Sequence, residues 1–76
     1  MMAAKLCALV YRQGKTDGRF EMRLDQLRKA SGWTMETLNT ALIAAERRDW
    51  IRRSRSRVAL KAVGIYIAKG VLGLPR

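Results

Sequence analysis

The chain has 76 residues and a mass of 8.6 kDa, which is room for one small domain with one hydrophobic core. Its 16 Lys and Arg against 6 Asp and Glu give a net charge of +10, which favours a polyanionic partner such as DNA, RNA or an anionic membrane face. The absence of His, the single Cys and the scattered carboxylates exclude the usual metal sites, an intrachain disulfide and paired-acid catalysis. We therefore expect no enzyme activity, no cofactor, no metal and no small-molecule ligand.

The two apolar ends of the chain do not predict membrane segments. The N-terminal stretch has no basic region before its apolar run and is interrupted by Lys5. The C-terminal stretch over residues 63–74 is shorter than the roughly 20 residues that span a bilayer, and Lys69 and three glycines break it. These patterns predict a soluble, cytoplasmic protein, and the positive charge predicts that it associates with the nucleoid.

The first predicted element is a helix over residues 2–13. Leu6 and Val10 recur at helical spacing on its buried face, with Cys7 half-buried on the flank. Gly14 stands where a residue in the left-handed region ends a helix, so we expect that conformation there.

A short strand and a second helix follow. Residues 15–18 predict a loop, and the alternation of polar and apolar residues over 19–24 predicts a half-buried strand. Asp25 either caps the next helix or lies in its first turn, where negative charge is favoured. That helix is about two turns long, buries Leu27 and stops at Gly32.

The third predicted helix runs from residue 35 to about residue 48. Thr34 is a good N-cap residue, and Asp49 stands where a glycine commonly ends a helix. The apolar residues of this helix recur at one-face spacing, which predicts a buried stripe. They are Leu38, Ala41, Leu42 and Ala45.

Two strands, over residues 50–54 and 57–61, are predicted around a tip at residues 55–56. The apolar residues of the two strands, Ile51 among them, can face the core, while the arginines line the outer side. The tail permits a short helix over residues 63–69.

The order helix, strand, helix, helix, strand, strand over residues 2–62 resembles the winged helix-turn-helix superfamily, most closely its MarR- and ArsR-like regulators. The stretch LDQLRKASGWTMETLNTALIAAERRDWIRRSRSRVALKA carries the resemblance, and Asp49 departs from the glycine common before the first wing strand. The resemblance implies one α+β domain over residues 1–76, with a three-helix core, a short strand, a basic β-hairpin wing and an apolar tail from residue 63. The family's core positions are occupied here by Leu27, Ala30, Leu38, Leu42 and Ile51.

In that family the third helix enters the major groove with its N-terminal side chains at base edges. Asn39 then pairs with adenine, and Ile43 or Met35 contacts a thymine methyl group. The alternative is that these side chains are only the solvated face of a core helix. The predicted base-reading residues are Thr34, Met35, Glu36, Asn39, Thr40 and Ile43.

The second predicted half of the interface is the arginine-rich hairpin. Residues 47–61 hold seven basic residues and one acid, which is six of the ten net charges. Arginine suits phosphates and narrow minor grooves, although an edge strand kept soluble by charge is an alternative. The predicted phosphate or wing contacts are Arg47, Arg52, Arg53, Ser54, Arg55, Ser56, Arg57 and Lys61.

The leading hypothesis is a double-stranded DNA-binding protein that acts as a small transcriptional regulator. The alternatives are a protein-interaction winged helix that binds an acidic partner and an RNA-binding domain. A homodimer through helix one and the tail is also predicted, unless these apolar ends pack together within one chain. The residues concerned are Met1, Met2, Leu6, Tyr11, Ile65, Tyr66, Ile67, Val71 and Leu72.

Overall fold

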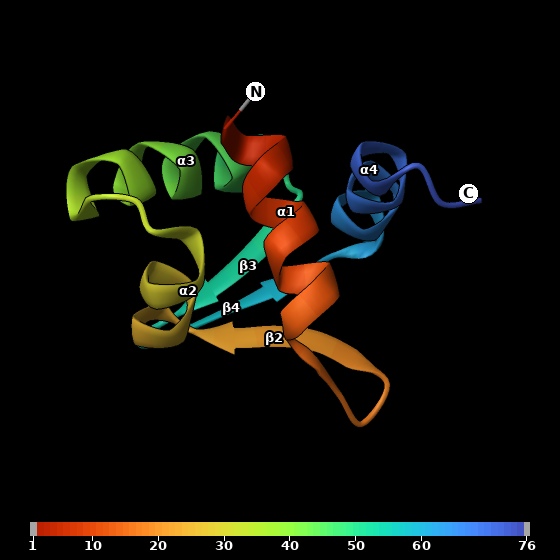
Figure 1. The fold of residues 1–76 in the computed structure, drawn as a ribbon, viewed down its shortest axis with the longest axis horizontal. Helices are drawn as coiled ribbons and strands as arrows, with labels where there is room; N and C mark the ends of the chain where they lie inside the picture. The colour runs from red at the N-terminus through yellow and green to blue at the C-terminus, as the bar shows by residue number, and fades with distance from the viewer. Residues whose placement is uncertain (1, 76) are drawn as a thin grey trace.

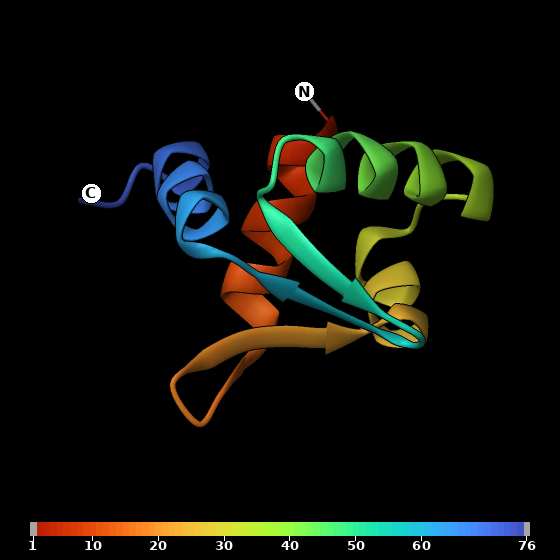
Figure 2. The same cartoon turned by 180° about the vertical axis from the view of Figure 1, so that it is seen from behind.

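Helices form one layer of the structure and an antiparallel sheet forms the other (Figure 1). The computed structural model describes residues 2–75, which form an α+β domain with the sheet order β1-β2-β4-β3. Viewed from behind, the strands lie in front of α1 (Figure 2). The elements in chain order are α1 (Met2–Gln13), β1 (Lys15–Thr16), β2 (Arg19–Arg23), α2 (Leu24–Ser31), α3 (Met35–Arg47), β3 (Ile51–Ser54), β4 (Arg57–Leu60) and α4 (Ala62–Leu72).

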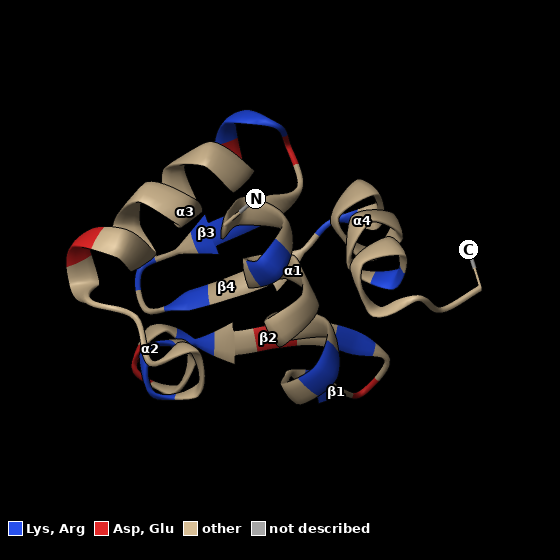
Figure 3. Cartoon of the chain, turned by 45° about the horizontal axis from the view of Figure 1, so that its top comes forward, with Lys and Arg blue, Asp and Glu red and all other residues tan. Residues whose placement is uncertain are grey.

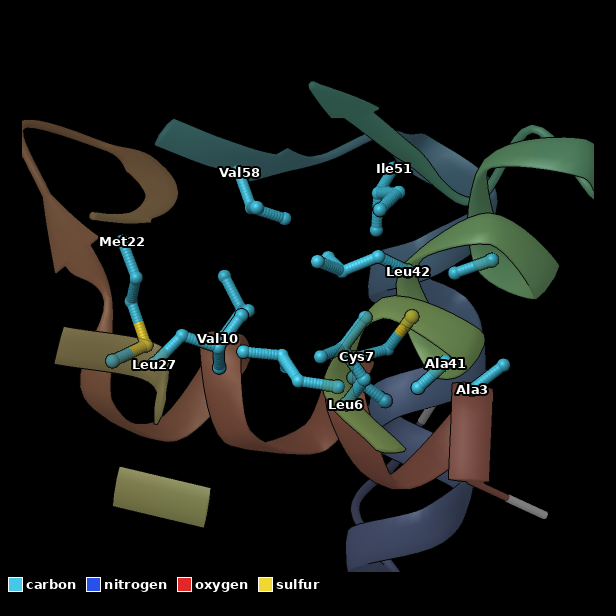
Figure 4. Close-up of a cluster of buried hydrophobic side chains, with 13 residues drawn as sticks. Ala3, Leu6, Cys7, Val10, Met22, Leu27, Ala41, Leu42, Ile51 and Val58 are labelled. Atoms are coloured by element: carbon cyan, nitrogen blue, oxygen red, sulfur yellow. The ribbon is translucent and has the colours of Figure 1, made fainter. Parts of the chain in front are cut away.

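The hydrophobic core fills the space between the two layers (Figure 4). The sheet contributes side chains from its inner face, and each of α1, α2 and α3 contributes the apolar stripe that its helical spacing predicts. Cys7 is completely buried in this core, and the expectation of a half-buried thiol was wrong. The largest fully buried side chains are Leu6, Leu27, Leu38, Leu42, Ile51, Val10, Val58 and Cys7.

Gly14 ends α1, but it is needed for close packing rather than for a left-handed conformation. Its φ is not among the positive values of the chain, so the expected left-handed cap was wrong. A Cβ at this position would lie 2.7 Å from the carbonyl oxygens of Glu21 and Val10. The backbone of Gly14 is hydrogen-bonded to these same two residues, from its N–H to Val10 and from the Glu21 N–H to its carbonyl. Only glycine allows α1 to meet β2 this closely.

The loop predicted over residues 15–18 is a β-hairpin. Thr16 pairs with Arg19, and the two residues between them, Asp17 and Gly18, have φ values of 49° and 77°. Positive φ at both central residues is the geometry of a type I′ turn, which the Asp-Gly dipeptide favours. The short strand β1 therefore extends the sheet beyond the predicted elements.

The connection between α2 and α3 follows the predicted caps. Gly32 has a φ of 70° and ends α2, and Thr34 accepts a hydrogen bond from the Thr37 N–H at 3.1 Å to begin α3. Asp25 lies in the first turn of α2, whereas the Gln26 side chain accepts from the Arg23 N–H at 3.3 Å. The positive φ of 61° at Asp49 agrees with the glycine-like position expected after α3.

The tail forms a longer helix than predicted, and α4 packs against α1. Thus the apolar ends of the chain do meet within one molecule, and Leu6 is fully buried rather than available to a second copy. Met1 lies outside the described residues. The apolar side chains that α4 leaves exposed include Val63, Tyr66 and Val71. None of the helices between residues 2 and 75 is long and apolar enough to cross a bilayer.

The first turn of α4 lies directly on the backbone of Trp50. The Lys61 N–H donates to the Trp50 carbonyl at 2.9 Å, and a Cβ on Gly64 would lie only 2.0 Å from the same oxygen. This joint fixes where α4 starts against the rest of the fold.

We expect Gly64→Ala to destabilise the domain by about 1–3 kcal/mol, because the clash is with backbone and outweighs the helix propensity gained by alanine. The measurement is urea unfolding, with Ala62→Ser as the control, since Ala62 is exposed on the same turn of the helix. A variant at position 64 that unfolds at the same urea concentration as the control would contradict the tight joint.

Candidate nucleic-acid interface

One side of α3 faces away from the core and carries every residue of the predicted base-reading set. Met35 and Ile43 are each 46% exposed, which leaves two large apolar side chains half in water on one helix. Asn39 makes no hydrogen bond to another described residue, so its amide is available to a partner. The exposed members are Thr34, Met35, Glu36, Asn39, Thr40 and Ile43.

Two hydroxyl groups of this set are engaged within the helix. The Thr34 hydroxyl accepts from the Thr37 N–H and donates to the Thr37 hydroxyl at 3.0 Å. The Thr40 hydroxyl donates to the Glu36 carbonyl at 3.0 Å, which leaves only its acceptor positions free. Thr34 is therefore a capping residue first, and Asn39 is the polar side chain best placed to contact a partner.

The exposed side of α3 is not itself basic (Figure 3). It carries Glu36 near its start and Glu46 near its end, against Arg47. The neighbouring helix α2 supplies positive charge at the border of this side, because its residues Arg28 and Lys29 are exposed. The positive charge near this side of α3 therefore comes from residues at its edges and on α2.

The arginine-rich hairpin is paired with the rest of the sheet along its length. β4 pairs with both of its neighbours from its first residue, Arg57, which lies opposite Arg23 of β2 and Ser54 of β3. The Leu24 N–H at the start of α2 donates to the carbonyl of Ser56 at 2.8 Å, so the tip is tied to α2. The predicted hairpin is thus present, and its second strand is the central strand of the β2-β4-β3 part of the sheet.

The strand register divides the hairpin arginines between two sides of the sheet. Residues directly opposite each other point to the same face, and Arg53 lies opposite the buried Val58. Arg52 lies opposite Ala59, on the other face. The expectation that all the arginines line the outer side was therefore wrong for Arg53, which shares the inner side at the exposed end of the edge strand.

The outer face of the sheet gathers basic residues from three strands. Arg57 is 3.7 Å from the partly buried Glu21 carboxylate, and Arg23 is 3.3 Å from the exposed Asp25 carboxylate. Lys61, just after β4, pairs with Asp49. Arg19 and Arg23 of β2 were missed, although the alternation that turns Phe20 and Met22 inward also turns the charged residues of this strand outward. The outer-face residues are Arg19, Glu21, Arg23, Arg52, Ser54, Arg57, Ala59 and Lys61.

A hollow of about 610 Å³ lies on this outer face. Ala59 of the central strand lies between Glu21 and Arg52 in one cross-strand row, so the floor is low and its two sides carry charge. Arg19 and Ile65, the latter from α4, also line it.

A second hollow, of about 540 Å³, lies beside the turn between α2 and α3. Leu24, Trp33 and Met35 make much of it apolar, and Arg28 and Lys29 border it. Trp33 packs partly against the core, so the hollow continues the exposed side of α3 toward α2.

Comparisons of this chain with protein-family models, with curated proteins and with solved structures found no match. The function is therefore inferred from the residues of the chain and their arrangement.

The acidic and sulfur-containing side chains of the described residues can be compared with the needs of a metal site and of a nucleophile. Residues 2–75 contain no group of three His, Cys, Asp or Glu residues placed to hold a metal ion. The single thiol, Cys7, is buried, and burial raises its pKa from 9.0 to about 11 because the thiolate would lose its hydration. Cys7 is therefore a core residue rather than a nucleophile.

We expect the Cys7 thiol to resist alkylation in the folded protein at pH 8, since raising the pKa by two units lowers the thiolate fraction on the order of 100-fold. Reaction with iodoacetamide, followed by mass spectrometry with and without urea, measures this protection. Because the folded thiol keeps its proton to higher pH than the unfolded thiol, Cys7 also makes folding less favourable as the pH rises from about 9 toward 11. The control is Cys7→Ala with Ser54→Cys, whose exposed thiol should react at once; equal rates at the two positions would contradict the buried site.

Proposed function

We propose that this protein is a winged helix-turn-helix protein that binds double-stranded DNA and places α3 in the major groove. The order of α1, β2, α2, α3, β3 and β4 is the order of that fold, and β1 and α4 are additions to it. The turn between α2 and α3, with its left-handed Gly32 and its Thr34 cap, supports the same proposal.

The observation that carries the proposal is the exposed side of α3. Met35 and Ile43 remain half exposed although a helix of this amphipathic type buries its other apolar residues. Methyl groups of this kind suit the thymine methyl in the major groove, and Asn39 between them offers the donor and acceptor that adenine requires. Asn39 lies between Met35 and Ile43 at four-residue spacing, so the three side chains lie on one side of the helix.

Phosphate contacts would come from residues at the two edges of α3. Arg47 ends the helix, and Arg28 and Lys29 lie on α2, the helix that crosses the backbone in this binding mode. Arg53 on the inner side of β3 and Arg55 at the tip extend this basic border. These side chains position the helix without reading sequence.

We expect Asn39→Ala to weaken binding to a preferred duplex, selected from a random pool, by about 1–3 kcal/mol while leaving random duplexes almost unchanged. Fluorescence anisotropy with both duplexes gives the two affinities. Gln13→Ala is the matched control, because it removes an exposed amide at the end of α1.

The same titrations, repeated at several salt concentrations, test the electrostatic part of the proposal. Contact with about five phosphates gives a slope of log K against log salt near −4 to −5. A flat salt dependence, or unchanged discrimination by Asn39→Ala, would contradict DNA reading by α3. Tighter binding to double-stranded RNA, or to an acidic polypeptide, would favour the alternatives instead.

A homodimer is part of the proposal, with an interface that differs from the predicted one because Leu6 is buried. Val63 and Val71 are 51% and 48% exposed on α4, and exposed apolar side chains gathered on one element are typical of interaction surfaces. Pairing would let two copies of α3 read two half-sites.

We expect analytical ultracentrifugation at micromolar protein, with DNA present, to show two copies of the 8.6 kDa chain on one selected site. Val63→Ser with Val71→Ser should reduce the complex to one copy without unfolding the chain, since both side chains are exposed. A single copy of the unmodified chain per site would contradict the dimer.

A further inference from the structure

We propose that the outer face of the sheet is a second binding surface, which holds the phosphate backbone of another duplex DNA segment so that one chain joins two segments. The proposal rests on DNA binding by α3 for the first segment. Its residues belong to β2, β3 and β4 and share none of the predicted base-reading set.

The register brings the basic side chains of this face into adjacent rows. Arg23, Arg57 and Ser54 lie side by side in one row, and Arg52 stands at the end of the next. Neighbouring strands are about 4.8 Å apart, so the rows form a plane about 10 Å wide. Arg19 adds a guanidinium group beyond the second row, where it lines the 610 Å³ hollow with Arg52.

Two of these arginines are free to bind an anion. Among residues 2–75, neither Arg19 nor Arg52 contacts a carboxylate. Arg23 and Arg57 do, but both arginine side chains are more than half exposed, and ion pairs at a protein surface are worth only about 0–1 kcal/mol. Exchange of these carboxylates for phosphate oxygens therefore costs little, and an arginine fork matches a phosphate well.

The shape of the face also suits a backbone. No helix covers these strands in the view from behind (Figure 2), and Ala59 keeps the centre of the sheet low. The small hydroxyl of Ser54 adds a neutral hydrogen-bond donor in the same plane. An open basic plane with a small-residue centre admits a rod of evenly spaced negative charges.

The two surfaces look away from the core in different directions. The buried stripe of α3, with Leu38 and Leu42, and the inner face of the sheet, with Ile51 and Val58, pack on the same core (Figure 4). The exposed side of α3 and the outer face of the sheet therefore both face away from this core and share no residue of the base-reading set. A duplex bound to α3 therefore leaves Arg19 and Arg52 available to bind a second DNA segment.

The test is a duplex-bridging assay with the full chain. One biotinylated duplex that contains the selected site is fixed on beads, and recovery of a second, fluorescent duplex is measured as protein is added. We expect Arg19→Ala with Arg52→Ala to lower recovery of the second duplex on the order of tenfold and to change binding of the first less than twofold. Arg19→Lys with Arg52→Lys should keep much of the recovery, because both charges remain.

The matched control is Lys5→Ala with Arg12→Ala, which removes the same charge from exposed positions on α1.

Sedimentation in the analytical ultracentrifuge shows whether the Arg19 and Arg52 variant keeps the oligomeric state of the unmodified chain. This measurement is needed because a dimer with two α3 helices could also join two duplexes. The proposal is overturned by a chain that recovers no second duplex, by unchanged recovery in the Arg19 and Arg52 variant, or by an equal loss in the control. It is also overturned if an acidic polypeptide, and not DNA, binds this face. Asn39→Ala separates the two questions when recovery is expressed per chain bound to the beads: it should lower the amount of protein on the selected duplex, while each bound chain should still recover the second duplex.

Discussion

The hydrogen bond from the Leu24 N–H to the Ser56 carbonyl fixes the position of the hairpin tip relative to α2. It joins the start of α2 to the tip of the hairpin, at the point where Arg57 begins to pair with Arg23. Only residues 55 and 56 lie beyond the last paired residues, Ser54 and Arg57, so the hairpin extends little beyond the sheet. The strand register then distributes the arginines of the hairpin between the two faces of the sheet, with Arg53 on the inner face and Arg52 and Arg57 on the outer face. The tip contact and the strand register together thus determine which arginine side chains lie on the same face and can bind the same partner.

The helices could be predicted from the sequence because their signals are local. The spacing of apolar residues gives each buried stripe, and Gly32 and Thr34 mark the ends of α2 and α3 by their own conformational preferences. The features that were missed depend on contacts between distant residues. The need for glycine at position 14 comes from carbonyl groups of two different elements, and the burial of Cys7 depends on α3 and α4 lying beside α1. The face to which Arg53 points follows from its pairing with Val58, and the sequence of a single strand does not predict this pairing register.

The candidate site was predictable to the same extent. The exposed residues of α3 follow directly from its buried stripe, so Asn39 and Ile43 could be assigned to solvent before the fold was known. The basic surface could be assigned only in part, because Arg19 lies more than thirty residues before the hairpin and joins it through the pairing of β2 with β4. The Asp-Gly turn at residues 17–18 was a local signal that could have revealed the hairpin containing Arg19.

A net charge of +10 on 76 residues opposes folding through self-repulsion, and the arrangement of the charges limits this cost. The side chains buried in residues 2–75 include no charged group, so every cation remains hydrated. The ion pairs Arg57–Glu21, Arg23–Asp25 and Lys61–Asp49 place half of the six acids beside cations on or next to the sheet. Such exposed pairs contribute little to stability, but they lower the repulsion within the outer face while no polyanion is bound. Because these pairs are weak, the three carboxylates are easily replaced by another anion, which is the exchange that the proposed phosphate contacts on the outer face require.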